Sequence, residues 1–171
     1  YALAVEATPP PRAALLPHIW LSDEEIRQGQ RLLEQLPDKA GTPPIALHPY
    51  ATHPDKAWKE AYWRQLMELF ESRGIPWIVI GRGSGMEGIP ASRNFTNRTS
   101  LRETCALLKS SSLLITGDSG PMHLAGAVGT PVLALFGPTT EEWGFFPAGP
   151  KDRVLESQLD CRPCTLHGKK H

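Results

Sequence analysis

Four continuous apolar runs, separated by segments with helical periodicity, constrain the fold of this chain most strongly. The runs are "PIALHPY" (44–50), "PWIVIG" (76–81), "LLITG" (113–117) and "PVLALFG" (131–137). Strands of a parallel sheet that is buried on both faces show such continuous hydrophobicity instead of alternation. We therefore predict an α/β fold with a doubly wound parallel sheet.

Helices are expected between and before these runs, at 22–39, 60–74, 99–112 and 121–129. Ser22 is a suitable N-cap for the first helix, and Gly74 is a suitable C-cap for the second. The side chains predicted to face inward are Ile26, Leu32, Leu33, Leu36, Trp63, Leu66, Leu69, Phe70, Leu101, Cys105 and Leu108. A short strand is expected at 93–97, and the chain after Pro138 is Gly/Pro-rich and predicted to be loop.

Length and charge limit the classes of function. The 171 residues suffice for one well-buried core, and 18 Lys and Arg balance 18 Asp and Glu. With a net charge of zero, no global field points to nucleic acid or to an anionic membrane, and no nucleic-acid partner is expected, although local basic patches remain open. No apolar run approaches the roughly 20 residues of a membrane span, and no leader resembles a signal peptide.

The beginning of the chain resembles the tail of a preceding folded unit, since it opens on Tyr1 and continues into a Pro-rich stretch around Pro9–Pro11. We expect residues 1–40 to be a linker and leading helix from a preceding domain. Residues 41–150 are then the ligand-binding domain, and residues 151–171 are a tail that contains Cys and His.

The three cysteines are too few for a disulfide scaffold. Cys105 falls in a helical pattern and is expected to be a small core residue. Cys161 and Cys164 form a C-x2-C pair that is followed by His167 and His171. Those four side chains could hold zinc, the two cysteines could be a redox pair, or the segment could be a plain terminal loop.

Open α/β sheets bind ligands at the carboxyl ends of their strands, so the loops there are the candidate site. The most informative loop is "TGDSGPMH" (116–123). Its glycines allow close approach of a ligand, and Asp118 or Ser119 can cap the helix that Pro121 begins. The free N–H groups of that first turn favour a phosphate, and His123 can donate to the same anion.

Two other loops are candidates at the same edge. In "HPYATHPDKAWKE", Lys56 can pair with a phosphate and the Thr52 hydroxyl can donate a hydrogen bond. "GRGSGMEG" (81–88) lacks the helix that a dinucleotide-binding fingerprint requires. It is interpreted as a flexible loop, with Arg82 or Glu87 as possible ligand contacts.

These motifs resemble the C-terminal domain of glycosyltransferase family 9, the bacterial heptosyltransferases. The resemblance rests on "TGDSGPMHLAGAVGTPVLALFGPTTEEW" and on "HPYATHPDKAWKEAYWRQLMELF", and it runs from about Ile45 to Pro138. It implies a Rossmann-like domain, the C-terminal half of a GT-B enzyme, which holds a nucleotide-sugar donor such as ADP-heptose. The "CRPC" of the tail also recurs in many members.

The resemblance further implies roles for individual residues. Thr52 and Lys56 would contact the donor phosphate or sugar, and Thr99 would lie near the adenine. Asp118 would bind the heptose hydroxyls. The diphosphate would be held by the Ser119 and Gly120 amides and by His123. In this sequence Arg82 and Gly83 stand where the family has an acidic ribose ligand, so the nucleobase and sugar are less defined than the diphosphate site.

The activity implied is inverting transfer of a sugar to a lipopolysaccharide-type glycolipid acceptor. The general base and the acceptor site would belong to the missing N-terminal domain, so no catalytic residue is assigned here and the fragment alone should transfer nothing. No metal or cofactor is expected, because the helix N-terminus, Lys56 and His123 stabilise the leaving group. The implied location is cytoplasmic, with peripheral binding of the full-length form to the inner membrane left open.

Two alternatives remain at this point. Nucleotide-sugar 2-epimerases share the GT-B plan, although their Gly-rich, Glu-containing signature differs from "DSGPMH". The other alternative is a non-enzymatic module in which the tail holds zinc and the sheet is only a scaffold.

Overall fold

The computed structural model describes residues 16–37, 41–140, 146–158 and 160. The helices are α1 (Asp23–Leu33), α2 (Glu60–Ser72), α3 (Leu101–Lys109) and α4 (Gly120–Val128), with a 3-10 helix at Pro54–Lys56. The strands are β1 (Ile45–His48), β2 (Trp77–Val79), β3 (Leu113–Gly117), β4 (Val132–Phe136) and β5 (Arg153–Glu156).

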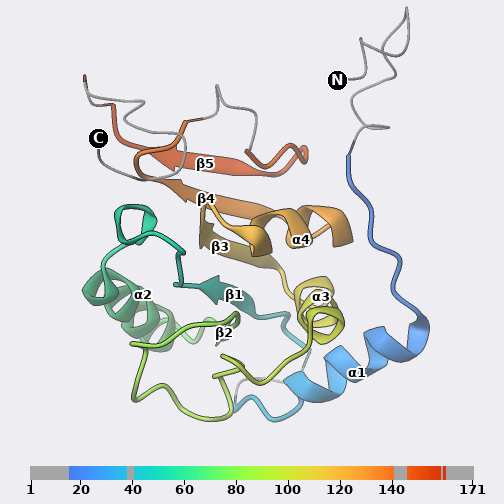
Figure 1. Cartoon of the computed structure of the whole chain (residues 1–171). Helices are drawn as coiled ribbons and strands as arrows, with labels where there is room; N and C mark the ends of the chain where they lie inside the picture. The colour runs from blue at the N-terminus through green and yellow to red at the C-terminus, as the bar shows by residue number, and fades with distance from the viewer. Residues whose placement is uncertain (1–15, 38–40, 141–145, 159, 161–171) are drawn as a thin grey trace, which may run out of the picture.

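The five strands form one parallel sheet in the order β2-β1-β3-β4-β5 (Figure 1). The chain first adds β2 on one side of β1 and then crosses to add β3 on the other side. The predicted α/β fold with a parallel sheet is therefore confirmed. The order reverses between β1 and β3, and in open α/β sheets this switch point is where a crevice forms.

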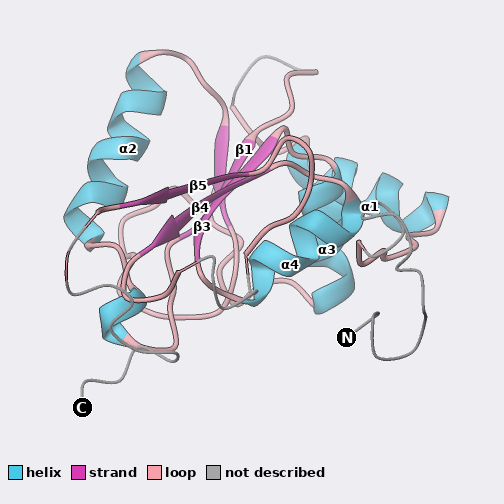
Figure 2. Ribbon diagram, turned by 90° about the horizontal axis from the view of Figure 1, so that it is seen from above, coloured by secondary structure: helices cyan, strands magenta, loops and turns pink. Residues whose placement is uncertain are grey.

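Helices cover both faces of the sheet. Figure 2 shows α2 on one side of the strands and α1, α3 and α4 on the other. Neighbouring strand residues point to opposite faces, so Leu114 joins a core cluster with α3 and α4, whereas Ile115 joins one with α2. Two buried cores explain why β1 to β4 are apolar at nearly every position.

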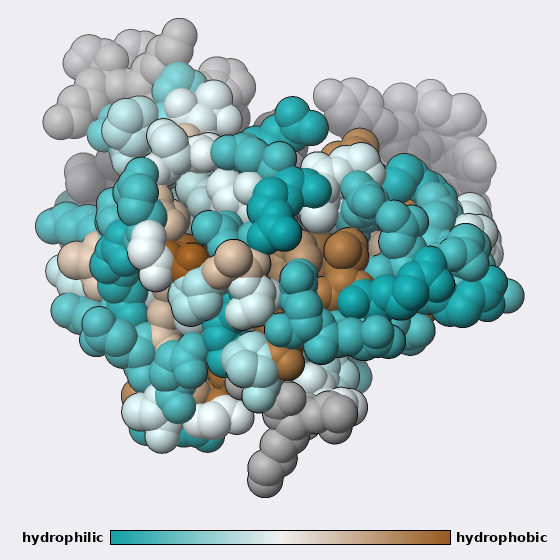
Figure 3. Space-filling model, turned by 90° about the horizontal axis from the view of Figure 1, so that it is seen from below, coloured by the Kyte–Doolittle hydropathy of each residue, from teal (hydrophilic) through white to brown (hydrophobic). Residues whose placement is uncertain are grey.

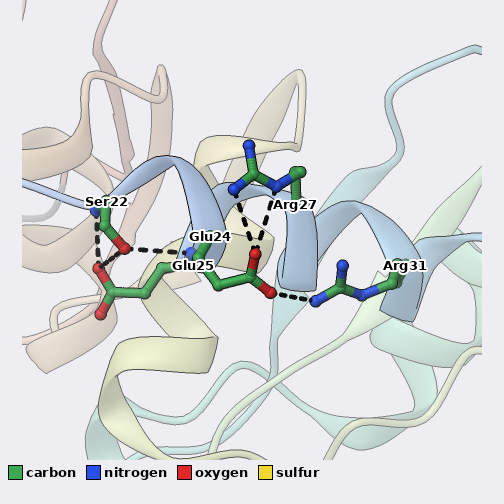
Figure 4. Close-up of polar contacts among 5 residues, drawn as sticks. All are labelled: Ser22, Glu24, Glu25, Arg27 and Arg31. Carbon is green, nitrogen blue, oxygen red and sulfur yellow. Dashed lines mark hydrogen bonds and ion pairs between the residues drawn. The ribbon is translucent and has the colours of Figure 1, made fainter.

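Two helices begin at capping boxes. The Ser22 hydroxyl accepts a hydrogen bond from the Glu25 N–H at the start of α1 (Figure 4), and Ser100 and Glu103 repeat the arrangement at α3. Each Glu carboxylate in turn accepts from the N–H of the serine, so two otherwise unpaired amides are satisfied at each end. The prediction of Ser22 as an N-cap is confirmed.

Some predicted helix boundaries and faces are wrong. The first helix ends at Leu33, six residues before the predicted end at 39. Leu69 and Leu101 were expected in the core but are 41% and 65% exposed, while Cys105 is buried as predicted. In α2, Met67 occupies the buried position instead of Leu69, because the buried stripe also passes through Trp63 and Phe70.

The predicted strand at 93–97 is only an isolated bridge between Val79 and Asn94. Conversely, β5 was missed, because the chain after Pro138 was expected to be loop. The sequence of β5, "RVLE", is mostly exposed and carries little apolar signal. It pairs with β4 at the edge of the sheet and extends the sheet past residue 150, the predicted end of the domain.

Helix α1 packs closely on α3. Gly29 faces the backbone of Ala106, and a Cβ atom at residue 29 would lie 2.7 Å from the Ala106 carbonyl oxygen. Arg102 of α3 donates to the carboxylate of Glu25 and to the carbonyl of Trp20. The leading helix therefore belongs to the layer that covers this face of the sheet.

The surface is mainly polar. Figure 3 shows hydrophilic side chains around a smaller central group of apolar ones on the face that it presents. The longest described helix, α2, has 13 residues, and none of the helices in the described part of the chain is long and apolar enough to span a bilayer.

Candidate functional site

A cavity of about 780 Å³ opens at the carboxyl ends of the strands, at the switch point between β1 and β3. Three loops surround it, one after each of β1, β2 and β3, and the first residues of α3 close another side. Its lining residues are His48, Pro49, Tyr50, Ala51, Thr52, Ala57, Gly81, Arg82, Gly83, Ser84, Thr99, Leu101, Thr104, Ser119, Gly120, Pro121 and Leu124. The volume suits a nucleotide-sized ligand.

The N-terminus of α4 lies at this cavity. Ser119 is in the N-cap position with an extended backbone, Gly120 begins the helix, and Pro121 occupies its first turn. The Ser119 side chain makes no capping hydrogen bond, in contrast to the predicted cap. Gly120 is exposed, and a Cβ atom there would meet nothing within 4 Å. The positive end of the helix dipole is thus uncovered at the cavity.

The Ser119 hydroxyl instead contacts residues at the ends of β1 and β3, and it also donates to the Gly117 carbonyl oxygen at 3.3 Å. Its Oγ lies 2.9 Å from Thr116 Oγ1 and 3.2 Å from His48 Nδ1, and the latter two atoms are 3.1 Å apart. His48 is 5% exposed. Burial lowers the pKa of His48 to about 4, so the ring is neutral at pH 7.

The Gly-rich loop after β2 provides room for two rings. A Cβ atom at Gly81 would lie 2.4 Å from His48 Cδ2, and one at Gly83 would lie 2.2 Å from Tyr50 Cδ1. The loop is also held in place, because Asn97 Nδ2 donates to the Gly83 carbonyl and Asn97 Oδ1 accepts from the Gly83 N–H. These two bonds attach the loop to Asn97, and its flexibility, which the sequence suggested, stays a prediction.

Lys56 and Asp118 form an ion pair beside the cavity. Lys56 Nζ donates to Asp118 Oδ2 at 2.6 Å, and both side chains are largely buried. The 3-10 helix that carries Lys56 packs over the strand ends, with the Lys56 carbonyl oxygen 3.3 Å from where a Gly117 Cβ would stand. A glycine at the end of β3 thus permits this close approach.

The predicted site residues fall into two groups. Thr52, Thr99, Ser119 and Gly120 line the cavity, whereas Lys56, Asp118 and His123 do not. Lys56 and Asp118 are next to the lining residues Ala57 and Ser119, and they are bound to each other. His123 is exposed on the first turn of α4.

The cavity residues that were not predicted as functional include His48, Tyr50 and Thr104. His48 is the last residue of β1 and Tyr50 follows it in "LHPY", so their position at the carboxyl end of a strand was an available signal. Of the two candidate contacts in the Gly-rich loop, Arg82 lines the cavity and Glu87 does not. Thr104 carried no signal, because it is inside a helical pattern.

The possible zinc ligands Cys161, Cys164, His167 and His171 lie outside the described residues. Within the residues that the structure describes, no group of three or more His, Cys, Asp or Glu side chains is arranged to hold a metal ion.

The parallel sheet and the crevice at its switch point define an α/β domain of the Rossmann type with a ligand site at its carboxyl edge. The chain belongs to glycosyltransferase family 9, the heptosyltransferases, whose family model matches residues 3–171.

Curated relatives agree with this assignment. Lipopolysaccharide heptosyltransferase 1 of Pseudomonas aeruginosa is 35% identical over 145 residues, which are 77% of this chain and 39% of the relative. Lipooligosaccharide heptosyltransferase 2 of Haemophilus influenzae is 28% identical over 160 residues, which are 83% of this chain and 46% of the relative. The chain therefore spans less than half the length of these relatives.

Solved structures share the fold. A family 9 glycosyltransferase from Veillonella parvula matches with a TM-score of 0.69 and 25% identity, over 82% of this chain and 42% of that one. ADP-heptose lipopolysaccharide heptosyltransferase II of Escherichia coli matches with a TM-score of 0.62 and 24% identity, over 81% of this chain and 45% of that one. An E. coli heptosyltransferase with bound ADP matches with a TM-score of 0.58 and 24% identity, over 74% of this chain and 41% of that one.

Proposed function

We propose that this chain is the donor-binding part of an inverting glycosyltransferase that moves heptose from ADP-heptose to a lipopolysaccharide-type acceptor. The observation that carries the proposal is the cavity at the β1/β3 switch point, bordered by the uncapped N-terminus of α4 and by the Lys56–Asp118 pair. Family membership supplies the reaction class.

The diphosphate of the donor is proposed to lie at the first turn of α4. The Ser119 and Gly120 amides would donate to its oxygens, where the helix dipole favours negative charge. Lys56 would turn from Asp118 toward the phosphates, and His123 would donate from the exposed side of the same turn. Together these groups stabilise the charge that develops on the nucleoside diphosphate as it leaves.

The nucleoside would occupy the remainder of the cavity. The Thr99 side chain and the neighbouring Leu101 and Leu124 provide a mixed polar and apolar wall for the adenine. Thr52 would contact the phosphate or sugar, and Asp118 would accept hydrogen bonds from the heptose hydroxyls. Arg82 lines the cavity on the other side, where it would lie near the ribose or a phosphate.

The acceptor and the general base are assigned to the part of the protein that the longer relatives have and this chain does not span. On this proposal the chain binds donor and transfers nothing by itself. The complete enzyme would act in the cytoplasm on a glycolipid at the inner membrane. The zinc-binding tail remains a separate hypothesis for residues 161–171.

Calorimetric titration of the chain with ADP, UDP and GDP tests the proposal, and we expect ADP to bind most tightly. Lys56→Ala should weaken ADP binding by about tenfold or more, since a largely desolvated phosphate contact is lost. Lys59→Ala removes the same charge three residues away at an exposed position and is the matched control. Equal binding by all three nucleotides, or equal losses in the two variants, would contradict the proposal.

A further inference from the structure

We propose that His48, with Thr116, is a positioning residue that holds the Ser119 hydroxyl away from the first turn of α4 and so keeps the backbone amides there open to the donor diphosphate. The inference rests on the proposed function, because it concerns access to the same anion site. It assigns a role to a side chain that does not itself need to touch the donor.

A comparison within the chain carries the argument. Three helices begin after a serine in the N-cap position with an extended backbone, namely Ser22, Ser100 and Ser119. Ser22 and Ser100 each accept a hydrogen bond from the third helical N–H at 3.2 Å, as Figure 4 shows for Ser22. Ser119 makes no such bond.

The difference arises from what surrounds the third serine. Its hydroxyl lies in a triangle with Thr116 Oγ1 and His48 Nδ1, with sides of 2.9, 3.2 and 3.1 Å. Thr116 is fully buried and His48 nearly so. The Ser119 hydroxyl also reaches the Gly117 carbonyl oxygen at 3.3 Å. These partners satisfy the hydroxyl in place of the cap that it would otherwise form.

His48 is fixed by its own packing. Its ring lies against Gly81, whose φ of 114° suits only glycine, and any side chain there would overlap the ring. The ring therefore has no room to move toward the Gly-rich loop, and its Nδ1 remains directed at the two hydroxyls.

A cap from Ser119 would obstruct the anion site. The second helical residue is Pro121 and has no N–H, so the cap would use the N–H of Met122, which now donates to the Ser119 carbonyl at 3.1 Å. The hydroxyl oxygen would then stand over the first turn. Its lone pairs would face the same direction as the oxygens of a bound diphosphate and repel them.

The test measures ADP affinity by calorimetry in the full chain, with His48→Leu made in two backgrounds. Leucine fills the site without a hydrogen bond, which leaves the Ser119 hydroxyl only Thr116 and the Gly117 carbonyl as partners. On this inference, Ser119 should then turn and cap α4. In the chain that keeps Ser119, we expect His48→Leu to lower the affinity for ADP about tenfold. In the Ser119→Ala background no cap can form, and the same substitution should change affinity by less than about twofold. His48→Asn, which keeps a polar atom near the position of Nδ1, should restore most of the binding.

An equal loss in both backgrounds, or none in either, would overturn the inference, since a general packing defect does not depend on the Ser119 hydroxyl. A crystal structure of His48→Leu gives a readout that needs no ligand. The Ser119 hydroxyl should accept from the Met122 N–H, and a hydroxyl that stays in place would also overturn the inference. If the unmodified chain fails to bind ADP, the proposed function fails, and this structure still decides the role of His48.

Discussion

Lys56 Nζ and Asp118 Oδ2 are 2.6 Å apart, with only 15% and 13% of the two side chains exposed. The pair joins the loop after β1 to the loop after β3 and therefore bridges the switch point of the sheet. Both residues were expected to face a donor, but in this structure they form an ion pair with each other. A diphosphate that enters must compete with the Asp118 carboxylate for the Lys56 ammonium group.

Asp118→Asn is therefore expected to strengthen ADP binding by roughly three- to tenfold, because it releases Lys56 and removes a negative charge beside the phosphates. The gain should shrink at high salt, and it should be smaller for ADP-heptose, whose hydroxyls are proposed to need the carboxylate. Calorimetry at low and high ionic strength measures both effects. Asp55→Asn, on the exposed side of the same 3-10 helix, is the control of equal charge, and an equal gain there would assign the effect to net charge alone.

The buried His48 predicts a specific dependence of stability on pH. Its pKa is about 4 in the folded chain, against an ordinary value of 6.5. Between these values the unfolded chain binds a proton that the folded chain does not, so stability decreases as pH falls from 6.5 toward 4, by at most about 1.4 kcal/mol per pH unit. Urea unfolding of the unmodified chain and of His48→Asn measures this. The carboxyl groups contribute to both proteins, so a difference in stability that stays constant with pH would show that His48 is not responsible.

Gly83→Ala should destabilise the fold by about 1–3 kcal/mol, since its Cβ atom would lie 2.2 Å from the ring of Tyr50. Tyr50 cannot easily withdraw, because its hydroxyl is 2.7 Å from Thr96 Oγ1. Denaturant midpoints provide the measurement. The loss should be much smaller in a Tyr50→Ala background, where the ring is absent. Gly126→Ala is the control, because a Cβ there meets nothing within 4 Å, and it should stabilise α4 by about 0.5–1 kcal/mol.

Gly29→Ala tests whether α1 is an integral part of this layer. An exposed helical Gly→Ala change normally stabilises, but here the new atom would lie 2.7 Å from the Ala106 backbone. We expect a loss of about 1–3 kcal/mol in the free energy of unfolding. Gln30→Ala, one residue further on an exposed position, should stay within about 0.5 kcal/mol of the parent. A stabilised Gly29→Ala variant would mean that the two helices do not pack as described.

The structural features that could be predicted from the sequence depend on residues that are close together along the chain. Continuous apolar runs predicted β1 to β4, and Ser22 predicted the start of α1, because burial on both faces and capping both leave local patterns. The same reasoning missed β5. Three of the four residues of this edge strand are exposed, so nothing in "RVLE" distinguished it from loop.

The loops of the candidate site were also found by local pattern, since strands that end in Gly, Ser and Asp meet at one edge of a parallel sheet. The contacts between side chains of these loops could not be found in this way. The bond between His48 and Ser119 joins residues 71 apart, and the pair of Lys56 with Asp118 joins residues 62 apart. Strand order and crossover decide such contacts, because only the packed sheet brings the ends of β1 and β3 side by side. The order of residues along the chain therefore determined which chemical groups gather at this edge, and three-dimensional packing alone decided which of them bind each other and which remain open to a ligand.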